Sequence, residues 1–135
     1  MTLDPTHIVP FSNLADPTQV ERALAAAARG EHGRRTLWVL LCDHDGELLQ
    51  PVAVDDVPRR PPLDQRVAWL DTLTTPLRGS GGAAVLIGIG RPGPDACTDD
   101  DRLWRAAAEQ VCDDDVRLLG VYLVNRRGVL PVTPR

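Results

Sequence analysis

The chain has 135 residues, 43% of them hydrophobic, which suits a single domain large enough to bury a substantial core. A formal net charge of -4 disfavours nucleic acid as the primary partner, although Arg34-Arg35 or Arg59-Arg60 would suit a local basic patch. All 15 basic residues are arginine, which excludes a Schiff-base lysine and the lysine of a P-loop.

The cysteines and the hydropathy pattern bear on the compartment of the protein. Cys42, Cys97 and Cys112 contain no C-x-x-C pair, and we recognise no secretory signal. These features predict reduced thiols in a cytoplasmic protein. No apolar run reaches about 18 residues, so we expect no membrane span.

Residues 1–33 are predicted to form an irregular lead-in followed by one helix. Asp16 followed by Pro17 is typical of a helix start, with a capping side chain and a proline at the first helical position. Apolar residues then recur at helical spacing over residues 20–28, and Gly30 suits the end of this helix.

Residues 36–43 (TLWVLLCD) form a nearly continuous apolar run, which predicts a strand buried on both faces. The His-Asp-Gly segment at 44–46 predicts a tight turn, because Asp-Gly supplies the positive φ that hairpins need. Residues 47–54 are the expected partner strand, in which Pro51 indicates a bulge or an edge position. A proline-rich surface loop follows at 55–62.

Apolar residues at helical spacing predict a helix from Leu63 to Leu77, ended by the segment RGSGG. Residues 83–89, the most apolar run, are the expected central strand. After a loop, Thr98 and Asp101 predict a capped helix start, with three consecutive acids at the positive end of the helix dipole. The expected buried face of this helix is Leu103, Ala107 and Val111.

Two further strands are predicted at 117–124 and 129–132, the second with Pro131 at its edge. The predicted order of elements is therefore α-β-β-α-β-α-β-β. This order indicates an α/β (α+β) fold, with a single mixed sheet flanked by helices. Residues 34–135 are expected to form the compact domain, with residues 1–33 attached to it.

The segment Gly88-Ile89-Gly90-Arg91-Pro92-Gly93 has the form G-x-G-x-x-G, the fingerprint of dinucleotide-binding loops. In such loops the strand turns directly into a helix, whose N-terminal amides hold the pyrophosphate. Here the helix begins only after Thr98, and its three acids would repel a phosphate group. A small-ligand or nucleotide sensor at Gly88–Gly93 is therefore the weakest of three functional hypotheses.

Several other residues have plainer structural interpretations. His44 in the hairpin turn is expected to be solvent-exposed, and Cys42 to lie in the core. The run Asp113-Asp114-Asp115 is expected to be solvated at a helix end. An exposed Trp69 or Trp104 would indicate a partner surface.

The order of elements, together with the loop after the central strand, resembles the JAB/MPN (JAMM) metalloprotease-like fold, most closely its RadC-type bacterial branch. In that family a strand ends in His-x-His-Pro, a short polar loop follows, and Ser-x-x-Asp opens a helix. Pro92 matches the proline, Gly93-Pro94-Asp95 the loop, and Thr98 with Asp101 the Ser-x-x-Asp. The resemblance covers about residues 34–132 and implies a cytidine-deaminase-like three-layer architecture.

The departures fall on the residues that the resemblance assigns to catalysis. In the family the two histidines and the aspartate hold zinc, and an upstream glutamate is the general base. Ile89 and Arg91 stand in place of the histidines, Arg35 lies near the glutamate position, and Glu31 comes four residues too early. Only Asp101 remains, and one carboxylate cannot hold zinc, which takes three protein ligands and a water. We therefore expect no metal and no other cofactor, and an Arg91–Asp101 ion pair at the former metal site.

These observations predict a catalytically inactive JAB/MPN-like domain, a pseudoenzyme that acts as a cytoplasmic protein-interaction or scaffold module. Its expected partner is another protein or a second copy of the chain. A second hypothesis is a hydrolase that uses Cys97, or the carboxylates of Asp95, Asp99 and Asp101, in a remodelled metal-free cleft. The residues expected in the residual cleft are Ile89, Arg91, Pro92, Asp95, Cys97, Thr98, Asp101 and Arg35.

Overall fold

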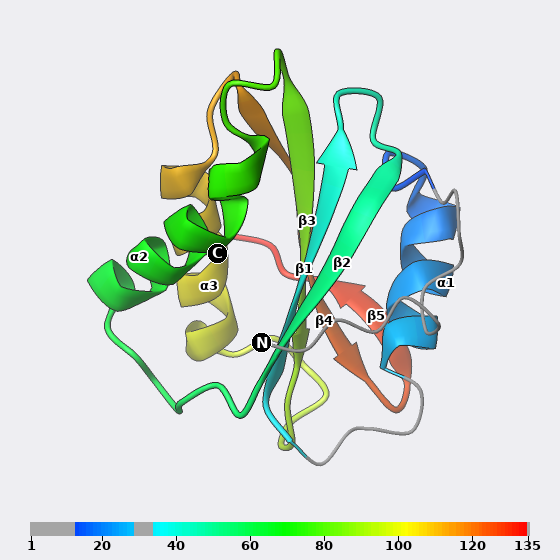
Figure 1. Ribbon diagram of the computed structural model, residues 1–135. Coiled ribbons are helices and arrows are strands. Elements are labelled where there is room, and N and C mark those ends of the chain that lie inside the picture. Colours follow the sequence, from blue (N-terminus) through cyan, green and yellow to red (C-terminus); the bar gives the residue numbers. More distant parts are fainter. Residues whose placement is uncertain (1–12, 29–33, 135) are drawn as a thin grey trace.

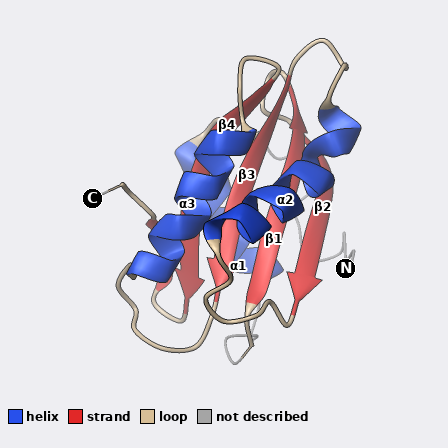
Figure 2. Ribbon diagram, turned by 90° about the vertical axis from the view of Figure 1, so that its left-hand side faces the viewer, coloured by secondary structure: helices blue, strands red, loops and turns tan. Residues whose placement is uncertain are grey.

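In the computed structural model, which describes residues 13–28 and 34–134, a mixed β-sheet lies between two layers of helices. Helix α1 (Pro17–Ala27) covers one face of the sheet, and α2 (Leu63–Thr74) and α3 (Asp99–Val111) cover the other (Figure 1). Figure 2 shows α2 and α3 in front of the strands, with α1 behind them. The predicted α/β (α+β) fold class and the predicted order of elements are confirmed.

The sheet has five strands in the order β2-β1-β3-β4-β5. Strands β3 and β4 pair in parallel, because α3 forms the crossover that a parallel connection requires. The other neighbouring strands pair antiparallel. Strand β3 is central, as predicted, and it is buried along its whole length. The bounds are β1 (Thr36–Asp43), β2 (Leu48–Asp55), β3 (Ala83–Gly90), β4 (Val116–Asn125) and β5 (Gly128–Pro131).

The two prolines predicted at sheet edges lie in the two edge strands, Pro51 in β2 and Pro131 in β5. An edge strand tolerates proline because its outer side has no neighbour that needs the missing N–H. The irregularity in the β1–β2 pairing falls between Leu41 and Cys42, whereas Pro51 itself stays in register with Leu40. Of the two interpretations of Pro51, the edge position is therefore the correct one.

Alternating side chains of β1 supply two separate cores. Leu37, Val39 and Leu41 face the core beneath α2 and α3. Trp38, Leu40 and Cys42 face the core that α1 closes with side chains such as Leu24. Helix α1 therefore packs as a layer of the same unit as the sheet. Within the described residues, no helix combines the length and hydropathy needed to cross a bilayer.

Both predicted helix caps form. The Asp16 carboxylate accepts a hydrogen bond from the amide of Thr18 at 3.0 Å, with Pro17 as the first residue of α1. In the capping box of α3, the Thr98 hydroxyl accepts from the Asp101 amide at 3.3 Å, and the Thr98 amide donates to the Asp101 carboxylate at 2.9 Å. Gly30 lies outside the described residues.

The structure corrects two details of the predicted helices. The stripe from Leu63 to Leu77 is split into α2 and a short 3-10 turn at Thr75–Leu77, because Pro76 lacks the amide that would continue the α-helix. On α3, Leu103 is 40% exposed and Trp104 is 3% exposed. The predicted residues are spaced by four, but an α-helix has 3.6 residues per turn, so residues at this spacing gradually leave one face of the helix. The buried face therefore contains Trp104 in place of Leu103.

Two glycines of the G-x-G-x-x-G segment make room for side chains in the core that α1 closes. A Cβ on Gly90 would lie 2.6 Å from ring atoms of Trp38, and a Cβ on Gly88 would lie 2.7 Å from the Leu24 side chain. Both distances are too short for real carbon contacts. Packing against an indole ring and a leucine thus explains both glycines without a phosphate ligand.

We expect Gly90→Ala to lower the free energy of unfolding by about 1–3 kcal/mol, because the added methyl group overpacks against the indole ring. Denaturant unfolding of Gly90→Ala, Trp38→Leu and the double variant completes a double-mutant cycle. The cost of the alanine should shrink in the Trp38→Leu background. An unchanged cost would show that Trp38 is not the reason for glycine at this position.

Candidate functional site

A cleft of about 740 Å³ opens at the end of the molecule where β3 ends and α3 begins. These two element ends lie in the lower part of the ribbon in Figure 1. Its walls come from the loop after β2, the first turns of α2, the loop after β3 and the start of α3. Prolines of both loops form much of the apolar wall. Five arginines line it: Arg35, Arg59, Arg60, Arg66 and Arg91.

Arg91 and Asp101 form the ion pair that the sequence predicts. Nε of Arg91 donates to Oδ1 of Asp101 at 3.0 Å, and Nη2 donates to Oδ2 at 2.7 Å, which is a bidentate pair. The two side chains are 4% and 0% exposed. The hydrogen bond to Asp101 raises the pKa of Arg91 above its usual value, so the guanidinium keeps its charge in this buried position.

The remaining donors of Arg91 hold the loop that follows β3. Nη1 donates to the carbonyl of Pro94 at 2.5 Å, and Nη2 also donates to the carbonyl of Ala96 at 2.9 Å. Asp101 accepts from the Thr98 amide as well, so one carboxylate joins the helix cap to the arginine. The loop from 92 to 97 is therefore wrapped around a single buried guanidinium.

Arg66 is a second buried arginine, and it is fully buried. Its Nε donates to the carbonyl of Pro61 at 2.8 Å, Nη1 to the carbonyl of Asp100 at 2.9 Å, and Nη2 to the Asp100 carboxylate at 2.5 Å. The guanidinium carbon lies 4.9 Å from the ring centroid of Trp104, within cation–π range. Nη1 of Arg35 lies 3.8 Å from the other oxygen, Oδ2, of the Asp100 carboxylate.

Arg66 was not among the site residues predicted from the sequence, although the pattern of α2 contained a signal. It lies three residues after Leu63 and four before Leu70, which places it on the apolar stripe of the helix. A charged residue in such a position is rarely buried without a partner. The stripe alone could therefore have indicated a buried ion pair, but it could not have identified Asp100 as the partner.

Of the eight residues predicted for the cleft, Arg35, Arg91, Pro92 and Thr98 line it. Ile89 is 5% exposed and borders a small adjoining hollow together with Arg35 and Arg91. Ile89 and Arg91 therefore face the same side, as alternate residues at the end of a strand do. Asp101 lies buried behind Arg91.

The other two predicted residues, Asp95 and Cys97, are not among those that line this cleft. The Asp95 carboxylate pairs with Arg127 at 2.9 Å, and the Cys97 sulfur lies 3.6 Å from the carbonyl of Pro131. Both contacts lie toward β4 and β5. The loop carries these residues away from the cleft because it bends around the Arg91 side chain.

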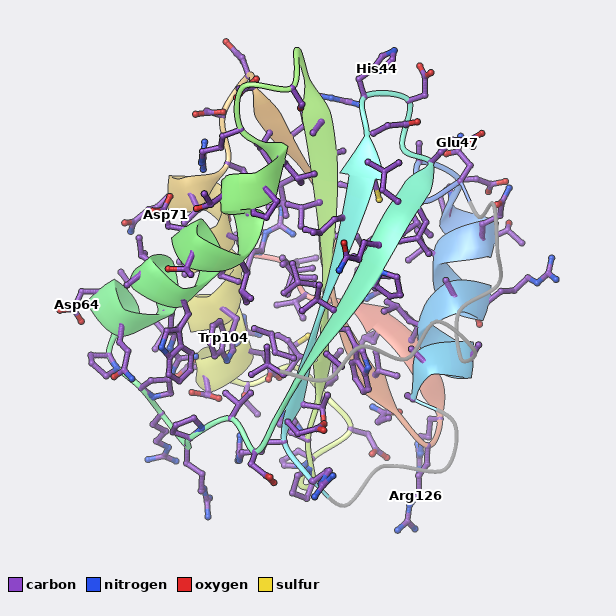
Figure 3. All side chains as sticks on the ribbon, viewed as in Figure 1. His44, Glu47, Asp64, Asp71, Trp104 and Arg126 are labelled. Atoms are coloured by element: carbon purple, nitrogen blue, oxygen red, sulfur yellow. The ribbon has the colours of Figure 1, made fainter. Side chains whose placement is uncertain are left out.

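The described residues bring no catalytic partner to Cys97. His44 lies in the β1–β2 hairpin, far from Trp104 and from the cleft end of the sheet (Figure 3). His7 and His32 lie outside the described residues. Burial raises the pKa of Cys42 to about 12 and that of Cys112 to about 11, so neither is an activated thiol.

The three carboxylates of the hydrolase hypothesis are each engaged by a different arginine. Asp95 pairs with Arg127, Asp99 with Arg102 at 3.2 Å, and Asp101 with Arg91. In residues 13–28 and 34–134, no group of three or more His, Cys, Asp or Glu side chains could hold a metal ion. The residues present at the predicted zinc position, an isoleucine and an arginine, do not fit a zinc site.

Trp104 is buried and stacks on Trp69, with ring centroids 6.1 Å apart and an interplanar angle of 22°. Neither ring is fully exposed, so Trp69 and Trp104 do not supply the exposed tryptophan that would indicate a partner surface. Trp69 is half-buried and borders a second hollow of about 350 Å³, beside β2, with mostly apolar walls.

Comparison of the chain with protein-family models, with curated proteins and with solved structures gave no match. The resemblance to the JAB/MPN fold therefore stays a prediction from the residues quoted for it.

Proposed function

We propose that the chain is a catalytically inactive JAB/MPN-like domain that acts as a protein-interaction or scaffold module. The buried, bidentate Arg91–Asp101 pair carries this proposal. In the resemblance, the aspartate is a zinc ligand and Arg91 stands in place of a histidine ligand. The second histidine position is Ile89, whose side chain borders the same small hollow as Arg91.

A guanidinium in this position replaces only part of what a metal ion supplies. It places a fixed positive charge against the Asp101 carboxylate and holds the loop through the carbonyls of Pro94 and Ala96. It has no open coordination position, so it cannot bind a water molecule and lower its pKa as zinc does. The local architecture is thereby kept while hydrolytic chemistry is lost.

An interaction role requires a surface for the partner. The apolar hollow beside Trp69 and the exposed Leu103 at the rim of the cleft supply apolar contact area on the α2/α3 side. The three cysteines are unpaired, which suits a reducing compartment such as the cytoplasm. We propose that a protein partner, or a second copy of the chain, binds on this side.

The test of the proposal is to restore the zinc ligands. The purified chain should contain less than one equivalent of zinc by elemental analysis. We expect the Ile89→His/Arg91→His variant to bind one zinc ion through its two histidines and Asp101, with Zn–N distances of about 2.0–2.1 Å by X-ray absorption. Zinc should raise the melting temperature of this variant and leave that of the original chain unchanged.

The matched control is the same double variant with Asp101→Asn, which removes the one ligand that the chain still has. A full equivalent of zinc in the original chain would contradict the proposal. Failure of a folded double variant to bind zinc, or binding that is unaffected by Asp101→Asn, would show that these three positions do not correspond to a metal site. Circular dichroism of each variant distinguishes that outcome from misfolding.

A further inference from the structure

The cleft beside α3 is positively charged, although the chain as a whole is acidic. Its buried charges are largely balanced. Asp101 neutralises Arg91, and Asp100 neutralises one of the two arginines beside it, Arg35 or Arg66. One positive charge of that Arg35–Asp100–Arg66 group is therefore left over.

The remaining lining charges add to this excess. Asp99 also lines the cleft and offsets one positive charge, although its carboxylate contacts Arg102 at 3.2 Å. Arg59 and Arg60 are exposed at the rim, and within the described residues neither has an ion-pair partner. The five arginines, set against Asp99, Asp100 and the Asp101 carboxylate behind Arg91, leave an excess of two positive charges in the cleft. The acids at the start of α3, which alone would repel a phosphate, are thus outweighed by arginines from other elements.

The cleft is held in shape by the buried arginines. Arg66 joins the Pro61 carbonyl of the loop after β2 to Asp100 at the start of α3. Arg91 fixes the opposite loop through the Pro94 carbonyl. A preformed site loses less conformational entropy when a ligand binds, so it binds an anion more tightly than a flexible site of the same charge would.

We propose that this cleft binds a small molecule that carries a diphosphate group. A terminal phosphate carries a charge of about -1.5 to -2 at neutral pH and the phosphate linked to it about -1, so a diphosphate group offsets the excess positive charge of the cleft. Exposed guanidinium groups at Arg59 and Arg60 are suited to bidentate contacts with phosphate oxygens. The volume of about 740 Å³ suits a ligand of nucleotide size, and Leu103 and the proline walls offer apolar contact for its organic part.

This inference depends on the arginines of the cleft and not on the family resemblance, so the two proposals can fail separately. We would titrate the purified chain with inorganic pyrophosphate, ADP and adenosine by calorimetry, at low salt and again at about 150 mM salt. We expect saturable one-site binding of ADP and pyrophosphate and none of adenosine. Tighter binding of ADP than of pyrophosphate would show that the organic part is also held.

The Arg59→Gln/Arg60→Gln variant should weaken ADP binding by about tenfold or more, because it removes two charged donors from the rim. Its melting temperature should not change, since both side chains are exposed. The matched control is Arg126→Gln/Arg127→Gln, which removes an adjacent exposed pair in the β4–β5 turn and the same charge. That control should bind ADP as the original chain does.

Three results would overturn the proposal. The first is an absence of binding by both phosphate probes at low salt. The second is equal weakening by the two arginine-pair variants, which would reduce the effect to overall charge. The third is preferential binding of a short single-stranded oligonucleotide over ADP, which would assign the patch to a nucleic acid backbone.

Discussion

Arg91→Met should lower the free energy of unfolding by about 3–5 kcal/mol, one of the two largest effects that we expect from a single substitution in this chain. The substitution leaves the fully buried Asp101 carboxylate without its bidentate partner. It also frees the carbonyls of Pro94 and Ala96 from their donor. For a domain of this size the melting temperature should fall by roughly 10–20 °C, measured by thermal unfolding.

The chain offers a matched control in Arg127→Met. Arg127 pairs with Asp95 at 2.9 Å, a distance close to that of the buried pair, but its side chain is 83% exposed. Solvent and salt screen such a pair, so its removal should cost only about 0–1 kcal/mol. Similar losses from the two substitutions would contradict the view that burial makes Arg91–Asp101 the central contact of the site.

A second variant distinguishes loss of the Arg91–Asp101 attraction from the cost of leaving the buried Asp101 carboxylate unpaired. Replacing both partners, as in Arg91→Met/Asp101→Leu, removes the buried charge together with its counter-ion. This double variant also loses the Asp101 half of the capping box, so it should recover only part of the stability lost in Arg91→Met. No recovery at all would indicate that the loop contacts of Arg91 outweigh its pairing with Asp101.

The elements of the fold could be predicted because their signals are local. Asp16-Pro17 and the Thr98–Asp101 capping box mark helix starts within one turn of chain, and apolar runs mark β1 and β3. The Arg91–Asp101 pair could also be predicted, because the resemblance to the JAB/MPN fold places both residues at the position of the family's metal site. The boundary at Thr74 was missed because the apolar stripe continues past Pro76 into the 3-10 turn.

The arginine cleft could not be predicted in the same way, because its arginines come from four separate segments. Arg59 and Arg60 were visible as a basic pair, but nothing local places that loop opposite Arg91. The charge of Asp100 could not be discounted from the sequence, since its partner Arg66 comes from another helix. Electrostatic sign at such a site depends on tertiary neighbours, which a single sequence does not provide.

Arg66→Met should destabilise the chain by a similar amount, about 3–5 kcal/mol, because Asp100 and two carbonyls lose a donor that is fully buried. Lysine should not rescue this site. The three donor nitrogens of Arg66 reach three separate acceptors, and a single ammonium group cannot reproduce that planar arrangement. Arg66→Lys should therefore remain at least about 2 kcal/mol less stable than the original chain in denaturant unfolding.

The same substitution links the stability of the fold to the anion site, because Arg66 holds the loop that carries Arg59 and Arg60 against α3. We expect the folded Arg66→Lys variant to bind ADP more weakly, although both exposed arginines are still present. An Arg66→Lys variant as stable as the original chain would show that the planar guanidinium group is not required at this position. Unchanged ADP binding in a destabilised variant would show that the cleft does not depend on Arg66 for its shape.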